Sequence, residues 1–585
     1  MAERELQRGR SIGGRTWVDV VGDCGPEALL ALCERLNVSQ GVGKILAARR
    51  LLDAGEAERF LNPVESQLHP PGLMLGMNEA VQRIVSAVER NQKIVVFGDN
   101  DVDGTASTTI LYSYLKRLGA RATYYLPHRI LDGYGFTPAT LQKLHAGGTD
   151  LVVATDHGST DLQGPPRLKE LGIDLIIADH HQLGAQKPEP AILLNPHQPG
   201  CSYPFKGLSA TGVVFKLVCG LDRHLESMDY WSQQGLCRTP PAYYLDLVAL
   251  ATVADMSPLV GENRILVKLG LEAINSHPRP GLAGLMRECH IRGPVTPNAI
   301  TFKLAPKINA LGRIGDPRVG VQLLVSHSYA EARRIARYMV QLNRERQELE
   351  HSALDSALSL AEAQADRPVM VLVGGDWHPG VVGSIASRLS FQTGKPTIVL
   401  TLSNAPQVVG SARGGAFGVN ILALLAACSP LLIRYGGHPA ACGLALDPAN
   451  LTEFTRRIYE AVAENPALCA GADNRPLEIE SWLEADALTH SFVEELAILS
   501  PFGHCNPEPV LAVRGVTLGN PTVFNQRHLR FSLLCPNGQA FDAMAWEHSA
   551  WSVSPDTPYD IAFMPQPGES GARTQVKVLD LIQVE

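Results

Sequence analysis

Short apolar runs that end in acidic residues recur in the first half of the chain. Residues 93–98, 150–155 and 173–178 read KIVVFG, DLVVAT and IDLIIA, and a polar, helix-compatible segment follows each of them. Apolar runs of strand length between helical segments are typical of a parallel sheet that is covered on both faces. From about residue 75 to 260 this alternation therefore predicts an α/β domain.

Changes in this pattern divide the rest of the chain. Apolar periodicity around 26–36 and 45–61 predicts a helical N-terminal segment. Between Val321 and Arg367 there is neither glycine nor proline, which predicts a long helix ending before Pro368. The strand-like run VMVLVGG then opens a second α/β segment, and runs such as HLRFSLL and TQVKVLDLIQ predict a small C-terminal β-barrel. We therefore expect five parts: 1–70, 71–320, 321–366, 367–465 and 466–585.

Composition agrees with this division. A chain of 585 residues, 45% hydrophobic and 19% charged, is an ordinary globular protein of several domains. It has neither a long uncharged apolar run nor a signal-peptide core, so we expect a soluble cytoplasmic protein. The 11 cysteines are scattered, which indicates neither a disulfide framework nor a zinc ribbon. A net charge of -8 argues against general nucleic-acid binding but allows a local positive channel.

The first apolar run is followed by three aspartates, Asp99, Asp101 and Asp103. Three carboxylates this close together are expected to need a cation to neutralise their charge. An EF-hand loop would need a carboxylate at its twelfth position, which is Ile110. A phosphatase of the haloacid dehalogenase type would use Asp101 as its nucleophile, although residues 98–100 separate that aspartate from the strand. A hydrolytic site with two divalent metals about 4 Å apart is the third interpretation, and it requires ligands at the ends of other strands.

Such residues follow the later apolar runs. Asp156 and His157 end the second run, the triplet Asp179-His180-His181 ends the third, and Asp255 ends a fourth at 245–254. Each aspartate alone is more often a helix cap or a turn residue. Because the carboxyl ends of parallel strands meet at one edge, the set together favours one metal site. Carboxylates with imidazoles suit manganese or magnesium better than zinc.

Taken together, GDNDVDGTAS, ATDHG, IADHH and ALATVADMSPL resemble the four motifs of the DHH phosphoesterase superfamily. Further segments are similar to the RecJ family of single-stranded-DNA-specific exonucleases: FLNP, LPHRILDGYGF, LAPKINALGRIGD, WHPGVVG, GSAR and YGGHPAACG. This resemblance runs from about residue 40 to the end of the sequence. It implies a DHH catalytic domain, a second, DHH-associated α/β domain joined to it by the long helix, and a C-terminal oligonucleotide-binding (OB) barrel. In that barrel, Phe531 is the aromatic residue that falls in a predicted strand.

The resemblance also implies a site. We expect two manganese or magnesium ions, with Asp156 bridging them and Asp99 acting as a ligand or supporting one; the ligand set is Asp99, Asp101, Asp103, Asp156, His180 and Asp255. His181 is expected near the scissile phosphate, oriented by Asp179. The expected phosphate contacts are Arg129, Asn309, Arg313, Ser411, Arg413 and His438. Asn100, His157 and Lys307 depart from the usual pattern of the family.

The implied activity is 5′-to-3′ hydrolysis of single-stranded DNA to mononucleotides in DNA repair and recombination. Single-stranded DNA is the expected partner, with a single-strand-binding protein and a helicase as further candidates, no membrane, and a monomeric state. Two alternatives remain open: a phosphatase acting on small phosphoesters, and a noncatalytic DNA-binding scaffold of a replication complex.

Overall fold

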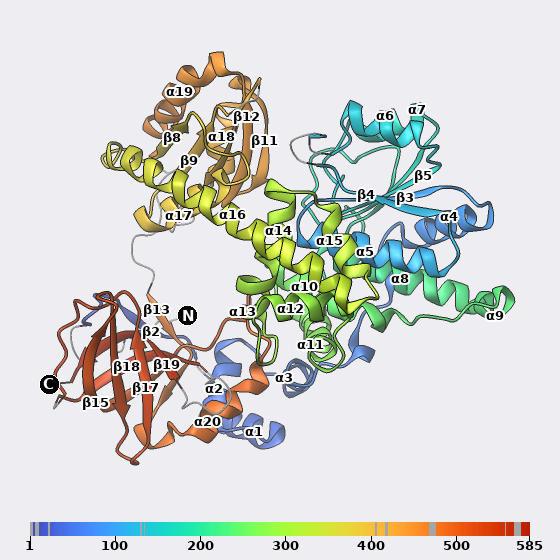
Figure 1. The fold of residues 1–585 in the computed structure, drawn as a ribbon. Helices are drawn as coiled ribbons and strands as arrows, with labels where there is room; N and C mark the ends of the chain where they lie inside the picture. Colours follow the sequence, from blue (N-terminus) through green and yellow to red (C-terminus); the bar gives the residue numbers. More distant parts are fainter. Residues whose placement is uncertain are drawn as a thin grey trace. The chain divides into compact units, whose positions relative to one another are not determined.

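The computed structural model describes residues 4–584 except 6–10, 22–23, 129–131, 134, 404–405, 416–418, 467–475, 556 and 567–574. The chain forms two compact units (Figure 1). The first contains residues 1–305, 320–333 and 475–585, and the second contains 306–319 and 334–474. Within the described ranges, every helix is too short or too polar to cross a membrane.

A five-stranded, all-parallel sheet forms the centre of the first unit. Its strand order is β4-β3-β5-β6-β7, with bounds β3 Ile94–Gly98, β4 Ala122–Tyr125, β5 Leu151–Thr155, β6 Asp174–Ala178 and β7 Ile192–Leu194. Helices α6 (Pro138–Ala146) and α7 (Gly164–Glu170) cover one face, and α4 (Met77–Glu89), α5 (Val102–Arg117) and α8 (Ala210–Ser227) lie on the other (Figure 1). The predicted α/β class is confirmed, and the three acidic motifs follow β3, β5 and β6 at one edge.

The apolar run before Asp255 forms a helix, α10 (Leu245–Ala254). It is buried on every side, since it packs against α5, α8 and α11 (Gly261–Ser276), and this explains why its sequence shows no helical periodicity. The helices that follow are α12 (Pro280–Glu288), α13 (Pro297–Ala299), a π-helical turn at Ile300–Leu304, α14 (Ala305–Ile314) and α15 (Arg318–Val325).

A buried ion pair joins α8 to α11. Lys216 Nζ lies 2.7 Å from Glu262 Oε1, and both side chains are at most 2% exposed. Glu262 also accepts hydrogen bonds from the Tyr203 hydroxyl and from the backbone N–H of His69, while Lys216 donates to the His69 carbonyl. Every polar partner of this pair is therefore inside the protein, as a buried charge requires.

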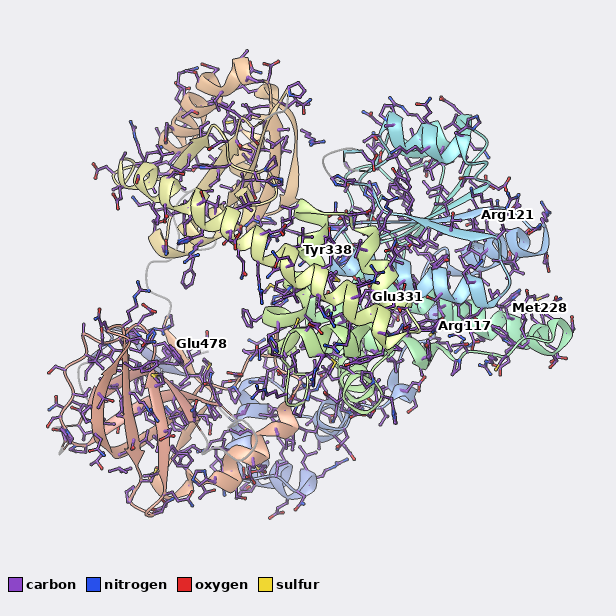
Figure 2. The ribbon with its side chains drawn as sticks, in the orientation of Figure 1. Arg117, Arg121, Met228, Glu331, Tyr338 and Glu478 are labelled. Atoms are coloured by element: carbon purple, nitrogen blue, oxygen red, sulfur yellow. The ribbon has the colours of Figure 1, made fainter. Side chains whose placement is uncertain are left out.

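The predicted long helix is present as α16 (Tyr329–Glu362), which has 34 residues and continues from the first unit into the second. Glu331 and Tyr338 project from it (Figure 2). It is separate from α15 because the residues between them form local hydrogen bonds: the Ser326 hydroxyl donates to the Ser328 carbonyl, and the Ser328 hydroxyl accepts from the Glu331 N–H. Serine hydroxyls compete with helical hydrogen bonds in this way.

The second unit contains a five-stranded mixed sheet of order β11-β12-β10-β9-β8. Only β8 and β9 among its strands pair in parallel. One face packs on α16 and α17, and the other on α18 and α19. The bounds are β8 Met370–Gly374, α17 Val382–Thr393, β9 Thr397–Thr401, β10 Val408–Arg413, α18 Ile421–Ala426, β11 Leu432–His438, β12 Ala441–Leu446 and α19 Leu451–Glu464.

The C-terminal strands form a closed barrel, which confirms the OB-like prediction. Its order is β15-β16-β17-β19-β18, closed by pairing of β18 with β15. The bounds are β15 Leu511–Phe524, β16 His528–Leu534, β17 Ala540–Ala545, β18 Tyr559–Gln566 and β19 Gln575–Gln583. A short strand, β14 (Ser481–Leu483), adds to β15, and helix α20 (His490–Glu495) lies in the segment between β14 and β15.

The N-terminal segment packs against this barrel. Helix α1 (Pro26–Leu36) coincides with the first predicted helical run, whereas the second run, 45–61, is divided between α2 (Gln40–Ala48) and α3 (Ala54–Leu61). Residues of all three helices share one core with the barrel strands. Before them, β2 (Trp17–Asp19) pairs with β1 (Arg4–Glu5) and with β13 (Leu477–Ile479). The fully buried Asp580 of β19 accepts hydrogen bonds from the Ser11 hydroxyl, the Gly13 N–H and the Trp17 indole N–H.

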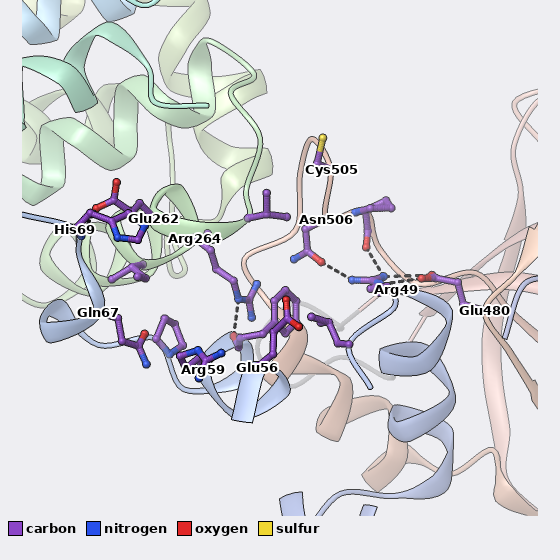
Figure 3. Close-up of a pocket in the computed structure, with 17 residues that line it drawn as sticks. Arg49, Glu56, Arg59, Gln67, His69, Glu262, Arg264, Glu480, Cys505 and Asn506 are labelled. Atoms are coloured by element: carbon purple, nitrogen blue, oxygen red, sulfur yellow. Dashed lines mark hydrogen bonds and ion pairs between the residues drawn. The ribbon is translucent and has the colours of Figure 1, made fainter. Parts of the chain in front are cut away.

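A pocket of about 490 Å³ lies between α3, the start of α11 and the loop before β15 (Figure 3). The buried Arg264 side chain lines this pocket and donates hydrogen bonds to the carbonyls of Phe60, Leu499 and Ser500. Burial lowers the pKa of Arg264 to about 9, because its partners are neutral carbonyls and Arg49 lies nearby. Arg264 thus joins the N-terminal helices to the segment that leads into the barrel.

Candidate metal centre

The turn between β3 and α5 carries the first three aspartates. A side chain at Gly98 would place its Cβ 1.9 Å from Thr108 Oγ1, and one at Gly104 would lie 2.4 Å from the Asp99 carbonyl oxygen. Only glycine allows the strand and the helix to approach this closely. Asp101 is the N-cap of α5 and accepts a hydrogen bond from the Gly104 N–H at 3.0 Å.

Asp103 is oriented by a different helix. Its two carboxylate oxygens accept the N–H groups of Ala210 and Thr211, each at 2.8 Å, and the Thr211 hydroxyl donates to its carbonyl. These N–H groups belong to the first turn of α8, where the helix dipole favours an anion. Asp103 is 1% exposed, and these hydrogen bonds fix the position of its side chain.

Asp156 begins the loop after β5 with a left-handed backbone, φ 60°. Its N–H donates to the Ala178 carbonyl at the end of β6, so the loop stays close to the neighbouring strand. The carboxylate is 3% exposed. A non-glycine residue in this conformation is uncommon and is tolerated best by aspartate and asparagine.

Asp179 organises the loop after β6. It accepts hydrogen bonds from the Ser159 N–H at 3.0 Å, from the His180 N–H at 2.7 Å and from His181 Nδ1 at 2.8 Å. Asn195, which follows β7, donates to the His181 carbonyl at 2.9 Å and to the Ser159 hydroxyl at 2.8 Å. Asp179 therefore holds the His181 ring, and Asn195 holds the backbone of the same residue.

His180 lies among the remaining carboxylates. Its Nε2 is 3.5 Å from Asp156 Oδ1 and 3.8 Å from Asp103 Oδ2, and its Nδ1 is 4.0 Å from Asp255 Oδ2. Asp255 ends α10 and accepts a 2.6 Å hydrogen bond from the Ser257 hydroxyl. Within the described part of the chain His180 Nε2 is buried without a hydrogen-bond partner, although the Asp156 and Asp103 carboxylates lie within 3.8 Å of it. An orphaned buried nitrogen of this kind fits a metal ligand.

The side chains fall into three overlapping groups, and the ligand atoms of each lie within 4.8 Å of one another. The groups share Asp156 and His180, so they form one continuous centre. Two neighbouring cation positions that share a carboxylate fit this arrangement, and the donor set of carboxylates and imidazole suits Mn²⁺ or Mg²⁺. The groups are Asp99-Asp101-Asp156, Asp103-His180-Asp255 and Asp156-Asp179-His180-His181.

The carboxylates of the centre repel one another. Burial raises the pKa of Asp156 well above its ordinary value, and the charges of Asp103 and Asp101 raise it further. Burial and the charge of Asp103 likewise raise the pKa of Asp255, to about 7. Each raised pKa means that a negative charge on the carboxylate is unfavourable here, and bound cations would offset this cost.

The Asp179–His181 pair has the opposite character. Burial alone would raise the pKa of Asp179, but the hydrogen bond and charge of His181 hold it well below its ordinary value. Burial opposes protonation of His181, but Asp179 raises the pKa of the imidazole to about 9. At neutral pH the pair is therefore an imidazolium bound to a carboxylate.

We expect Asp179→Asn to lower the rate of the reaction catalysed at this centre by roughly 10- to 100-fold, the usual effect of removing a group that orients a ligand. The amide cannot accept from three donors as a carboxylate does, so the His180-His181 segment loses its fixed position. Single-turnover rates at saturating metal would measure the change. Asp174→Asn, at the other end of β6, is the matched control, and an equal fall in that variant would contradict the assigned role.

The second unit contains most of the residues expected to contact phosphate. Ser411 and Arg413 lie on β10, where Arg413 Nη1 donates to Ser411 Oγ at 2.6 Å and Arg413 Nε donates to Ser387 Oγ at 2.8 Å. Asn309 and Arg313 lie one helical turn apart on α14. His438 ends β11, and its carbonyl accepts from the Cys442 thiol. Arg129 lies outside the described residues.

A side chain at Gly380, in the WHPG segment, would meet the Arg313 carbonyl at 2.4 Å, so that segment packs directly on α14. These two segments of the second unit are therefore in direct backbone contact.

Ser159, Asn195 and Thr211 were not predicted from the sequence. Each supports the centre by a hydrogen bond to a residue distant in the chain, and no local motif marks such a contact.

Two residues singled out in the sequence are buried in the structure. His157 is buried, with its ring centroid 5.8 Å from Phe97 and 5.3 Å from Phe136, so this departure from the motif affects packing on the sheet face. Phe531 points into the barrel core with 2% exposure, so it is not a base-stacking residue. Its position in an alternating strand did not reveal which face it occupies.

Family models match most of the chain. A model described as the DHH family, N-terminal domain, matches residues 93–252. A DHHA1 domain model matches residues 366–464, and a RecJ OB domain model matches residues 479–579. The matched ranges correspond to the parallel sheet with α5–α10, to the sheet of the second unit, and to the barrel.

Named relatives agree with these models. The chain is 33% identical over 508 residues to the single-stranded-DNA-specific exonuclease RecJ of Bacillus subtilis, spanning 86% of this chain and 62% of that protein. It is 33% identical over 522 residues to the RecJ protein of Dickeya dadantii, spanning 86% of this chain and 87% of that protein.

Crystal structures of RecJ from Thermus thermophilus are similar in fold as well. The structure in complex with Mn²⁺ matches with a TM-score of 0.78 and 28% identity, covering 96% of this chain and 78% of that one. The structure in complex with Mg²⁺ matches with a TM-score of 0.74 and 26% identity, covering 96% and 77%.

Proposed function

The chain belongs to the RecJ family, and we propose that it is a single-stranded-DNA-specific exonuclease acting in DNA repair and recombination. It removes mononucleotides in the 5′-to-3′ direction by hydrolysing the terminal phosphodiester. The observation that carries this proposal is the continuous acidic centre in which Asp156 belongs to two of the three ligand groups. A shared carboxylate between two cation positions is the arrangement used for hydrolysis of phosphodiesters.

The residues of the centre divide into ligands and supports. Asp99, Asp101 and Asp156 would hold one ion, and Asp103, His180 and Asp255 the other. Asp156, whose Oδ1 lies 3.5 Å from His180 Nε2, is the candidate for a shared ligand. When bound, two Mn²⁺ or Mg²⁺ ions supply Lewis acidity and an activated water. Asp103 needs no rearrangement to act, because the first turn of α8 already fixes its carboxylate.

His181 is proposed to hold the scissile phosphate by a charged hydrogen bond. Its imidazole, with a pKa of about 9, is protonated at neutral pH and is directed through Nδ1 by Asp179, while Asn195 holds the backbone carbonyl of His181. An imidazolium can donate to a phosphate oxygen and pass a proton to the departing 3′-oxygen. Asp179 acts through His181 and is a positioning residue.

The second unit would supply the grip on the DNA backbone. Asn309, Arg313, Ser411, Arg413 and His438 are proposed to contact phosphate, together with Arg129 of the first unit. Arg413 is prepared for this role because the Ser387 and Ser411 hydroxyls and the Ala412 carbonyl fix its guanidinium, and none of these partners neutralises its charge. Lys307 on α14 would add a point charge.

One experiment separates the exonuclease from its alternatives. Single strands labelled at the 5′ or the 3′ end, and the matching duplex, are incubated with the full chain and Mn²⁺ or Mg²⁺, with EDTA as the control. We expect the 5′ label to appear at once as a mononucleotide, while the 3′-labelled strand shortens progressively and the duplex stays intact. Loss of the 3′ label first would contradict the direction. Binding without cleavage would favour the scaffold, and hydrolysis of small phosphoesters alone would favour the phosphatase.

We further propose that the protein acts as a monomer in the cytoplasm and meets its substrate together with a single-strand-binding protein and a helicase. Size-exclusion chromatography with light scattering would test the monomeric state, and pull-down with each purified partner would test the contacts. The acidic net charge of -8 implies that DNA contacts are local, so salt should weaken binding only in proportion to the few phosphates held.

A further inference from the structure

The pocket between α3, the start of α11 and the loop before β15 has no part in the proposed reaction (Figure 3). All of its lining residues belong to the first unit, and its volume of about 490 Å³ is in the usual range for a site that holds a small molecule. Leu51, Pro63 and Ile265 form part of its lining, and we call these three residues the apolar wall. The rest of the lining is largely polar or charged, and the charges indicate which class of ligand fits.

The buried carboxylates of the lining are already neutralised. Glu262 Oε1 lies 2.7 Å from Lys216 Nζ, and Glu480 Oε1 lies 2.7 Å from Arg49 Nε. A further carboxylate of the lining, Glu56, is exposed on α3. The two ion pairs therefore contribute no net charge to the pocket.

Arg264 has no such counter-ion within the ranges that the structure describes. It is 2% exposed, its guanidinium lies 3.8 Å from the centroid of the Phe60 ring, and it donates four hydrogen bonds, all to neutral backbone carbonyls. Burial and the charge of Arg49 lower its pKa, and burial and the charge of Arg264 in turn lower the pKa of Lys268. A buried cation without a counter-charge is costly, and an anion in the adjoining pocket would offset that cost.

Two further features make the pocket suitable for an anion. Arg59 is exposed on α3 and lines the pocket, so its guanidinium is accessible to a ligand. Helix α11 begins at the pocket with Gly261, and Val260 before it provides no side-chain cap for the first N–H groups. These N–H groups carry the positive end of the helix dipole.

We propose that this pocket binds a nucleoside phosphate, with the phosphate near Arg59 and Arg264 and the nucleoside against the apolar wall. A pocket of 490 Å³ is much larger than inorganic phosphate requires, and its apolar wall suits the organic part of such a ligand. Two sources share this chemistry: the mononucleotide released at the metal centre and the nucleoside triphosphates of the cell. Binding here requires neither metal ions nor cleavage, so it can be measured in EDTA whether or not the chain is an exonuclease.

Cys505 provides a reporter, because it is exposed and lines the pocket. The full chain is alkylated with N-ethylmaleimide in EDTA, with dTMP, ATP, thymidine or inorganic phosphate added, and mass spectrometry follows each cysteine. We expect dTMP or ATP to slow alkylation of Cys505 by about tenfold when present at roughly ten times its dissociation constant. The exposed Cys237, which does not line the pocket, should react at an unchanged rate. The nucleotide that protects at the lower concentration identifies the source.

Two substitutions on α3 should change the affinity in opposite directions. Arg59→Gln removes a cation and should weaken binding by roughly two- to fivefold, whereas Glu56→Gln removes a carboxylate and should strengthen it by a similar factor. Both side chains are exposed, so neither change removes a buried contact. Amide hydrogen exchange in the first turn of α11 should slow on binding, and this readout does not use the thiol.

Protection by a nucleotide together with opposite shifts in the two variants would support the proposed site. No change in either readout with dTMP and ATP would overturn it, as would affinity shifts of the same sign in the two variants. Protection by thymidine equal to that by dTMP would exclude a role for the phosphate. Protection by inorganic phosphate equal to that by dTMP would exclude a role for the nucleoside.

Discussion

Replacing Asp156 with asparagine is expected to lower the rate of single-strand cleavage by at least about a thousandfold, since the metal centre supplies several kcal/mol of transition-state stabilisation. Asp156 belongs to the group with Asp99 and Asp101 and lies 3.5 Å from His180 Nε2, so its loss is expected to affect both proposed cation positions. Asparagine is the appropriate replacement because it tolerates the left-handed backbone at φ 60° and keeps the loop folded. Single-turnover cleavage of a 5′-labelled strand would measure the rate, and calorimetric titration with Mn²⁺ would measure the loss of metal binding.

The control for Asp156→Asn is Asp174→Asn. Asp174 begins β6 at the opposite edge of the same sheet and forms a partly exposed ion pair with Arg83. Its replacement removes one carboxylate and should cost less than about 1 kcal/mol of stability, without changing the rate. Activity of Asp156→Asn within tenfold of wild type would exclude a bridging role for this carboxylate.

Glu262→Gln should destabilise the first unit by about 3–5 kcal/mol, the usual cost of removing one partner of a buried ion pair. The substitution keeps the shape and most hydrogen-bond partners of the side chain, but Lys216 becomes a buried cation without a counter-charge. Amide hydrogen exchange in α8 and α11 would measure the effect, with protection factors falling by roughly a hundredfold or more.

A second substitution tests the cause of that loss. Lys216→Met in the Glu262→Gln background removes the unpaired charge and should restore most of the protection. Glu226→Gln is the surface comparison, because the Glu226 side chain is 56% exposed in its ion pair with Arg238. This substitution should change the free energy of unfolding by less than about 1 kcal/mol. No recovery in the double variant would show that the hydrogen bonds to Tyr203 and His69 matter more than the charge.

The fold was largely predictable because its signals are local. Uninterrupted apolar runs marked β3, β5 and β6, and the absence of glycine and proline marked the long helix. The start of α16 also has a local signal, since Ser328 and Glu331 have the spacing of a capping box and the Ser328 hydroxyl accepts the Glu331 N–H. By contrast, the strand at Trp17–Asp19 was not predicted, because one of its two partner strands, β13, lies some 460 residues later in the chain.

The sequence predicted which acidic side chains come together at the sheet edge, but it did not predict the residues that support them. Asp156, Asp179 and Asp255 each end an apolar element, so sequence position alone indicated where they converge. Ser159, Asn195 and Thr211 have no such signal, because their roles come from contacts across the sheet edge. For the barrel, alternation correctly indicated a strand around Phe531 but could not assign inside and outside, and this required the pairing register.

The hydrogen bonds between Asp580 and the first residues of the chain have a consequence for folding during translation. Ser11 and its partner Asp580 are 569 residues apart, and the helices of the N-terminal segment share their core with the barrel. At about 5–20 residues per second, a ribosome needs roughly 30 to 110 s to bring the two together. During that interval the apolar faces of α1, α2 and α3 have no barrel to cover them. A nascent chain of this protein should therefore depend on chaperones at its first segment, while the parallel sheet is already complete.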